Sequence, residues 1–334
     1  MLRMLILILA AALIWSVWWA LGSTGAETAT RAWFDARRAD GWVAKYGQMK
    51  VQGFPGRLDT VFKELTLADP VSGLAWEAPR FQINALSYRP NHLIAVWPDE
   101  QLITTPQGRF RIESNDMRAS LLVAPKPDLP LKRATLSAEA IGIVSADGAP
   151  QMASRTLVLA AEQRDDRPEA YRLGVDAADL VVPADWLALI DPDGDLPDKL
   201  SRLKADLTVS FDRVWDMRAI ERDRPQPRRV DLRLAEAAWG GLQMQMTGTL
   251  TIDADGLPTG EITIKTRNWR GILDIGLRSG LIPPELATPL KEALGLMAQL
   301  KGDPKTLDIP LSFRDGRMQF GPVVIGPAPV LTIR

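Results

Sequence analysis

His92 and several groups of aspartates are the residues that could carry chemistry in this chain. His92 is the only histidine, and there is no cysteine. The missing thiols exclude disulfides, thiolate metal sites and thiol nucleophiles. A Ser-His-Asp triad would have to use His92, which has Asn91 beside it but no nucleophile next to it in the sequence. We therefore expect His92 to anchor a turn or to make a structural hydrogen bond.

The aspartate groups do not match a metal or acid–base site. Residues 191–195 place carboxylates at the first, third and fifth positions of a calcium loop, but the glycine comes too early and Arg202 stands where a bidentate Glu is required. Asp253 and Asp255 fall where two strands need a turn. Asp165 and Asp166 lack the apolar surroundings that would separate their pKa values. We therefore expect no catalytic residue, metal or cofactor, and no enzyme activity.

Charge and composition restrict the partners. The chain has 334 residues, with 40 Lys and Arg against 41 Asp and Glu, and it contains no basic block. Nucleic acid is therefore an unsuitable partner, because phosphate binding needs concentrated positive charge.

The N-terminus carries a membrane signal. Residues 4–21 form an unbroken apolar run after Arg3. As a helix the run would measure about 27 Å, close to the ~30 Å hydrocarbon core of a bilayer, and Trp18 and Trp19 near its end favour the headgroup boundary. We expect residues 1–22 to be an uncleaved anchor whose residues 4–21 cross the inner membrane once. A cleaved signal sequence is the alternative, with a candidate site near Ala20.

The remainder of the chain is expected on the outer side of that membrane. Long domains translocate largely regardless of their charge, so we place the C-terminal part in the periplasm. Residues 22–25 suggest a break, after which apolar residues recur at helical spacing. The pattern predicts a juxtamembrane amphipathic helix over residues 23–47, packed under the next domain or lying on the bilayer.

From residue 48 to residue 334 the apolar period is two, which indicates β-strands. Residues 242–252 alternate most clearly, and with residues 258–265 they predict a hairpin with one apolar face. The chain's 25 Pro and 25 Gly separate such runs, as in antiparallel meanders. Two helical stripes are expected, one from Trp269 to Leu277 and one from Pro283 to Met297 with a kink at Pro289. Residues 162–168 are either a division between domains or a long hairpin loop.

The apolar face of this β body is the candidate binding surface. It could be an ordinary closed core, or it could hold acyl chains, for which flexible methionines are suited. The residues expected to line an acyl-chain groove are Leu203, Leu207, Leu242, Met244, Met246, Leu250, Ile252, Ile262 and Ile264.

Several segments resemble a family of bacterial envelope proteins that is known only as a domain of unknown function. The segments are Gly53-Phe54-Pro55 with Arg57-Leu58-Asp59, residues 86–94, residues 253–260, residues 309–316, and the closing Gly-Pro segments of residues 321–329. Gly56 departs from the pattern, which has a bulky apolar residue there. The resemblance implies an N-terminal membrane anchor and a Gram-negative envelope location, but no reaction.

The order of elements also resembles the AsmA-like proteins, which are anchored β-groove proteins implicated in phospholipid movement or envelope maintenance. The fold expected is therefore mainly β, with large twisted antiparallel sheets folded into an open groove or clam, an anchor helix, a juxtamembrane helix and a few short C-terminal helices. The function expected is non-enzymatic binding or shielding of lipid acyl chains beside the inner membrane, with phospholipid as partner. The alternative is a structural adaptor that docks another envelope protein through its β body.

Overall fold

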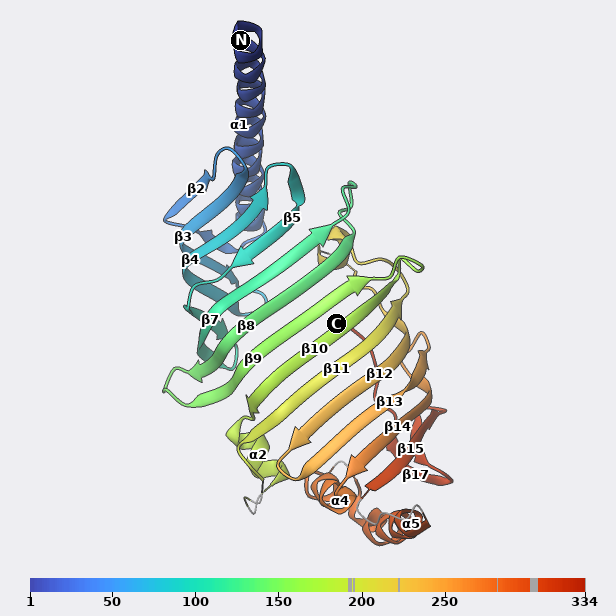
Figure 1. Ribbon diagram of the computed structural model, residues 1–334. Helices are drawn as coiled ribbons and strands as arrows, with labels where there is room; N and C mark the ends of the chain where they lie inside the picture. The colour runs from blue at the N-terminus through green and yellow to red at the C-terminus, as the bar shows by residue number, and fades with distance from the viewer. Residues whose placement is uncertain (192–193, 195, 222, 281, 301–305, 334) are drawn as a thin grey trace. The chain divides into compact units, whose positions relative to one another are not determined.

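The computed structural model describes residues 1–191, 194, 196–221, 223–280, 282–300 and 306–333 (Figure 1). The chain is mainly β, and it divides into two compact units. The first unit comprises Met1–Pro125 and Ala134–Pro150, and the second comprises Lys126–Arg133 and Gln151–Arg334. Strand β8 (Leu131–Ser145) contributes residues to both units.

A single helix begins the first unit. Helix α1 (Leu2–Ala39) has 38 residues, and it is the one described helix that is long and apolar enough to cross a membrane. The break predicted at residues 22–25 is absent, because the helix is supported on both sides of them by contacts with the sheet. The Ser23 hydroxyl donates to the Ala20 carbonyl within the helix and does not cap a new one. The helix also ends earlier than the predicted residue 47, since residues 43–45 already form a strand.

The first unit's sheet is antiparallel. Strands β1 (Val43–Lys45) and β2 (Gln48–Gln52) both pair with β3 (Arg57–Asp69), which pairs with β4 (Leu74–Leu86). Strands β5 (Arg89–Val96) and β6 (Glu100–Thr105) each pair with β4 on one side and with β7 (Gly108–Val123) on the other. β5 and β6 therefore lie one after the other between β4 and β7.

An aromatic cluster fixes the C-terminal half of α1 to this sheet. Phe34 is 3% exposed and contacts Tyr46 and Phe62, with ring centroids 4.9 and 5.8 Å apart. Arg38 adds a hydrogen bond of 2.7 Å from its Nε to the Ala44 carbonyl. The helix predicted to lie under the following domain or on the bilayer therefore packs on the protein over its second half.

The second unit is a meander in which each strand pairs with the next. Its strands are β9 (Pro150–Gln163), β10 (Ala170–Val181), β11 (Lys199–Phe211), β12 (Pro227–Trp239), β13 (Leu242–Ile252), β14 (Pro258–Arg267), β15 (Thr306–Arg314), β16 (Arg317–Phe320) and β17 (Val323–Pro327). All eight consecutive pairs are antiparallel. The predicted hairpin is confirmed, with Met246 opposite Ile264 and Leu250 opposite Gly260. Residues 162–168 comprise the end of β9 and most of the turn of the β9–β10 hairpin, which lies inside this unit, and the division lies elsewhere.

The turn of the β13–β14 hairpin is held by an aspartate. Asp253 Oδ1 accepts hydrogen bonds of 3.0 and 2.8 Å from the backbone N–H groups of Asp255 and Leu257. A carboxylate that binds the backbone two residues on stabilises such a turn. The Asp253 carboxylate thus has a structural role in this turn.

Helices cover one end of the second sheet (Figure 1). The two predicted stripes correspond to α4 (Trp269–Arg278) and to the 3-10 turn η1 (Pro284–Leu286) followed by α5 (Ala287–Leu300). Pro289 falls in the first turn of α5, where its missing N–H costs no helical hydrogen bond, so the predicted kink is not needed. Two further short helices, α2 (Ala184–Ile190) and α3 (Met217–Glu221), were not predicted.

A second core forms beneath α4 and α5. Trp269 and Leu273 of α4, Leu290 and Leu294 of α5, and Leu307 of β15 are all at most 6% exposed. The apolar spacing that predicted these helices thus corresponds to the faces that they bury.

Truncating a buried side chain of α5 should destabilise the protein, whereas truncating an exposed side chain of the same helix should have little effect. Leu294 is 4% exposed and Leu296, one half-turn away on the same helix, is 61% exposed. Leu294→Ala is expected to lower the free energy of unfolding by about 2–5 kcal/mol, and Leu296→Ala by less than about 0.5 kcal/mol. Urea denaturation of the full-length protein in detergent, followed by circular dichroism, measures both. Equal losses would contradict the assigned packing.

An apolar face on the second sheet as candidate functional site

The candidate site is a regular array of side chains on one face of β9–β13. Side chains of a strand alternate between the two faces, and paired residues of neighbouring antiparallel strands share a face. One row across the strands is Leu157, Ala177, Leu203, Ala237 and Met244. The next row is Leu159, Val175, Ala205, Ala235 and Met246, and the third is Ala161, Leu173, Leu207, Leu232 and Gly248. We call these three rows the apolar array.

All nine residues predicted to line a groove lie on β11, β13 and β14, but their surroundings differ. Leu250, Ile252 and Ile262 are at most 8% exposed and belong to the closed core. Met246 and Ile264 pack against the cluster around Leu250, and Leu207 packs against the cluster around Tyr171. Leu203, Leu242 and Met244 remain partly exposed. The structure thus separates the predicted set into a core at one end and an accessible part in the first rows.

Small side chains occupy the middle of the accessible part. Ala177, Ala205, Ala235 and Ala237 sit on β10–β12, with Leu157 and Leu159 on one side of them and Met244 and Met246 on the other. Ala177 is buried, at 2% exposed, whereas the other three alanines are partly exposed. Leu159 is 38% exposed, although its neighbours on this face are apolar. A strip of methyl groups bordered by longer side chains is suited to the contact of a slender apolar chain.

The chain's own C-terminus closes the adjoining end of this face. Ala328 and Leu331 pack with Leu250, Ile262 and Phe313. Leu331 donates its backbone N–H to Gly256, and Ile333 exchanges two hydrogen bonds, of 2.9 and 3.0 Å, with the Gln226 side chain. Residues 328–333 therefore cover the fourth row of the sheet, which consists of Tyr171, Val209, Val230 and Leu250.

Tyr171 organises a second cover beside the tail. It is 1% exposed, and its hydroxyl donates to the Leu131 carbonyl at 3.3 Å and accepts from the Trp215 backbone N–H at 3.2 Å. Burial raises the pKa of the Tyr171 hydroxyl, so it stays protonated as a donor. Phe211 and Trp215 complete this cluster, with ring centroids 5.5 Å apart.

The opposite face of the same strands is charged. Asp206 on β11 accepts hydrogen bonds from Arg172 on β10, at 3.0 and 2.8 Å, and from Arg233 on β12, at 2.6 Å. The hydrogen bonds from Arg172, and then those from Arg233, lower the pKa of the Asp206 carboxyl to about 2 against the opposing effect of burial. One carboxylate thus joins three strands on the polar side.

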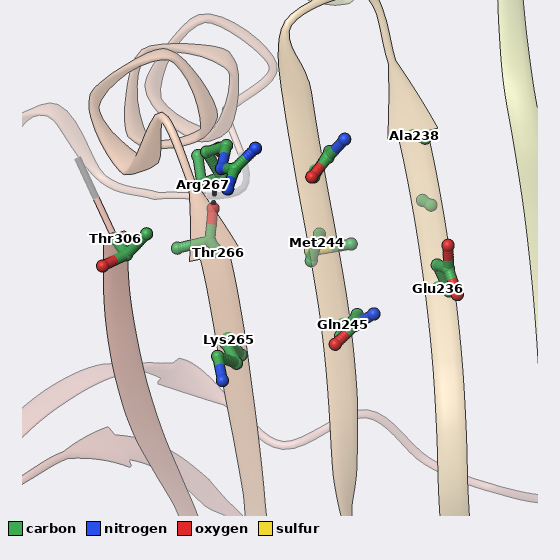
Figure 2. Close-up of a pocket in the computed structure, with 10 residues that line it drawn as sticks. Glu236, Ala238, Met244, Gln245, Lys265, Thr266, Arg267 and Thr306 are labelled. Atoms are coloured by element: carbon green, nitrogen blue, oxygen red, sulfur yellow. Dashed lines mark hydrogen bonds between the residues drawn. The ribbon is translucent and has the colours of Figure 1, made fainter.

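Two hollows in the described part of the second unit have linings of both polar and apolar residues. One of about 340 Å³ is lined by Glu162, Arg172, Asp176 and Asp206 among others. Another of about 210 Å³ lies across β12–β15, where Figure 2 shows Glu236, Gln245 and Lys265 on neighbouring strands. Both are shallow and open. Met244 reaches the edge of the second hollow, so the apolar array is bordered there by charged side chains.

The residues considered for catalysis have structural partners. His92 lies in β5, not in a turn, and its Nε2 is 2.8 Å from Ser120 Oγ on β7. Neither residue lines any of the hollows described above. Asp191 is 3% exposed, and its Oδ2 accepts a hydrogen bond of 2.7 Å from the Leu196 backbone N–H. Residues 193 and 195 of the calcium-loop comparison lie outside the described residues.

Sequence reasoning missed two sets of contacts. The C-terminal tail and the Tyr171 cluster join residues more than 40 positions apart, and nothing in a local period signals them. A third set was missed as well, because Trp18 and Trp19 were interpreted only as residues of the membrane boundary and Trp15 was given no role. Their spacing of three and four residues places them on one face of α1, which could have indicated a shared contact.

Fold and site together define a mainly β protein with an N-terminal apolar helix and an apolar face on its second sheet. The chain belongs to the family described as "Uncharacterized protein conserved in bacteria (DUF2125)", which it matches over residues 19–329. No curated protein and no solved structure matches it. The resemblance to a family of unknown function is therefore confirmed, whereas the similarity to AsmA-like proteins stays a prediction.

The charged face provides a test of pH dependence. Because the pKa of Asp206 is lower in the folded protein, its contribution to stability is complete above its ordinary pKa and is lost as the pH falls through about 2. Asp206→Asn should cost about 1–2 kcal/mol at pH 7, allowing for solvent screening at the half-exposed arginines. The difference from wild type should narrow between about pH 4 and pH 2.

The control for this prediction is Asp223→Asn. Asp223 is 75% exposed and its ion pair with Arg213 is 3.9 Å long, so its loss should change stability little at any pH. Thermal denaturation across the pH range measures both variants. A cost for Asp206→Asn that does not vary with pH would contradict the electrostatic assignment.

Proposed function

We propose that this protein binds lipid acyl chains on the apolar array of β9–β13 while α1 holds it to the inner membrane. The observation that carries the proposal is the array itself, which is apolar on three rows, partly exposed, and opposed by a charged face on the same strands. Residues 4–21 would be the span, with both units in the periplasm. The protein would then be a non-enzymatic component of lipid transport or envelope maintenance.

The energetics of lipid handling support this proposal. Exposing a sixteen-carbon chain to water costs about 13 kcal/mol at ~0.8 kcal/mol per CH₂ group. A protein surface lowers this cost only if it is apolar and remains accessible. The partly exposed Ala205, Ala235 and Ala237 provide such a surface, because their small side chains let an acyl chain approach the sheet closely while Leu157, Leu159, Met244 and Met246 flank them.

The anchor supplies proximity in this proposal. The first residues of α1 are exposed, including Leu5, Ile6, Leu9 and Leu13, each at least 54%. Insertion of these side chains into a bilayer removes them from water and keeps the chain beside a source of lipid.

Photocrosslinking tests the proposal without confusing bound lipid with lipid around the anchor. The full-length protein is reconstituted into vesicles that contain a phospholipid with a diazirine in its acyl chain, irradiated, digested and mapped by mass spectrometry. Crosslinks within residues 1–21 report the span and serve as an internal reference. Crosslinks on peptides of β9–β13 are the expected result, and their absence beside crosslinked anchor peptides would overturn the lipid proposal.

A matched pair of variants assigns any crosslinks to the correct face. Leu203 and Lys204 are neighbours on β11 whose side chains point to opposite faces. Leu203→Asp should lower the yield on β9–β13 by at least roughly tenfold, because a carboxylate would be placed against the bound chain. Lys204→Asp should leave the yield unchanged. Circular dichroism verifies that both variants fold, and equal yields would show that the array is not the binding surface.

A further inference from the structure

Three tryptophans near the middle of α1, where its apolar run ends, donate hydrogen bonds to backbone carbonyls of the first unit. Trp15 Nε1 donates to the Pro55 carbonyl at 2.9 Å, Trp19 Nε1 donates to the Arg57 carbonyl at 2.6 Å, and Trp18 Nε1 donates to the Ser87 carbonyl at 3.4 Å. Pro55 and Ser87 belong to two loops, β2–β3 (residues 53–56) and β4–β5 (residues 87–88), at one end of the first unit's sheet, and Arg57 is the first residue of β3.

These two loops form one connected structure. The Ser87 backbone N–H donates to the Gly56 carbonyl at 3.0 Å, and the Ser87 hydroxyl donates to the Pro55 carbonyl at 3.3 Å. The Phe54 ring meets the Trp19 ring edge-on, with centroids 5.4 Å apart. In Figure 1 the loops lie beside the middle of α1, and the N-terminal part of the helix continues past them.

The part of α1 that precedes these loops is too short to cross a bilayer by itself. The residues ahead of Trp15 amount to about 20 Å of helix, well short of the ~30 Å hydrocarbon core. The turns that carry Trp15, Trp18 and Trp19 must therefore enter the membrane boundary for the helix to cross it. The loops that bind these tryptophans are then at the same depth.

The exposure of two loop side chains and the hydrogen bonding of three backbone carbonyls both support a position at the membrane boundary. Phe54 is 57% exposed and Tyr88 is 60% exposed, and both sit at the loop tips. A backbone carbonyl in a membrane must find a donor within the protein, because water is scarce there. The indole N–H groups provide donors for Pro55, Arg57 and Ser87. Exposed Arg57 and Arg89 lie just behind the tips, where anionic headgroups would meet them.

We propose that the loops of residues 53–56 and 87–88, together with Trp15, Trp18 and Trp19, form a collar that inserts Phe54 and Tyr88 into the lipid headgroup boundary. The partner is the surface of the bilayer that α1 crosses. The collar attaches the first unit to that surface at two loops in addition to the helix. This inference requires α1 to be in a bilayer, but it does not require the apolar array of the second unit to bind lipid.

Spin labels can measure the depth of the collar, because the chain has no cysteine of its own. Single variants Phe54→Cys and Tyr88→Cys are made in the full-length protein, which is labelled with a nitroxide and reconstituted into phosphatidylethanolamine–phosphatidylglycerol vesicles. Power-saturation spectroscopy compares collisions with oxygen, which concentrates in lipid, and with a water-soluble nickel chelate. Leu9→Cys, within the apolar run, gives the reference for a lipid-embedded position.

Val71→Cys is the matched control. Val71 is an apolar turn residue, 93% exposed, and it lies at the opposite end of the same strands β3 and β4. The thirteen residues of β3 separate the two ends by about 40 Å. The ratio of oxygen to nickel collisions at positions 54 and 88 should exceed that at position 71 by at least roughly threefold.

The outcomes separate this inference from the proposed function. Equal ratios at positions 54, 71 and 88, beside a lipid-embedded Leu9→Cys, would overturn the collar even if lipid crosslinks are found on β9–β13. A water-exposed Leu9→Cys would overturn it as well, because α1 would then not be in the bilayer. Tyr88 has no ring contact with Trp19, so agreement between positions 54 and 88 also shows that loss of the Phe54 contact did not displace the loop.

Discussion

Alternation of side chains between the two faces of sequentially paired strands is the constraint on which the second unit depends. A slip of one residue would move a strand's apolar set to the charged face. At the bulges between Leu232 and Ala235 of β12 the pairing resumes with a shift of one residue, which keeps Leu232 and Ala235 on the same apolar face. Each strand therefore receives its orientation from the one before it, and the three apolar rows and the Asp206 contacts are two results of the same pairing.

Individual strands, turns and helices could be predicted from the sequence, because the patterns that indicate them lie within a few neighbouring residues. The period of two marked β13 and β14, aspartate and glycine marked their turn, and the spacing of Trp269, Leu273 and Leu277 marked α4. These patterns reflect burial on one face, which the structure shows. The hairpin at residues 162–168 was one of two alternatives, and only pairing of β9 with β10 could decide between them.

The failures arose where tertiary contacts outweigh local preference. Gly22 and Gly25 are poor helix residues, with a cost of about 1 kcal/mol each, yet α1 continues through them because the tryptophans and Phe34 fix the helix to the sheet on both sides. Similarly, alternation placed Leu203 and Leu250 on one face but could not show that the tail covers only Leu250. The accessible part of the candidate site depended on residues 328–333, far away in sequence.

The order of strands in the second unit has a consequence for how the chain reaches this fold. Because β9–β17 pair in sequence order, nearly every contact that a strand needs is available as soon as it and its predecessor have emerged, from a ribosome or across a membrane. The sheet can grow from one end to the other. The segment of Leu331 and Ile333 is different, since it reaches back to Gly256 and Gln226 and can bind only after residues 331–333 themselves have appeared. Closure over the row that contains Leu250 therefore follows pairing of the strands beneath it.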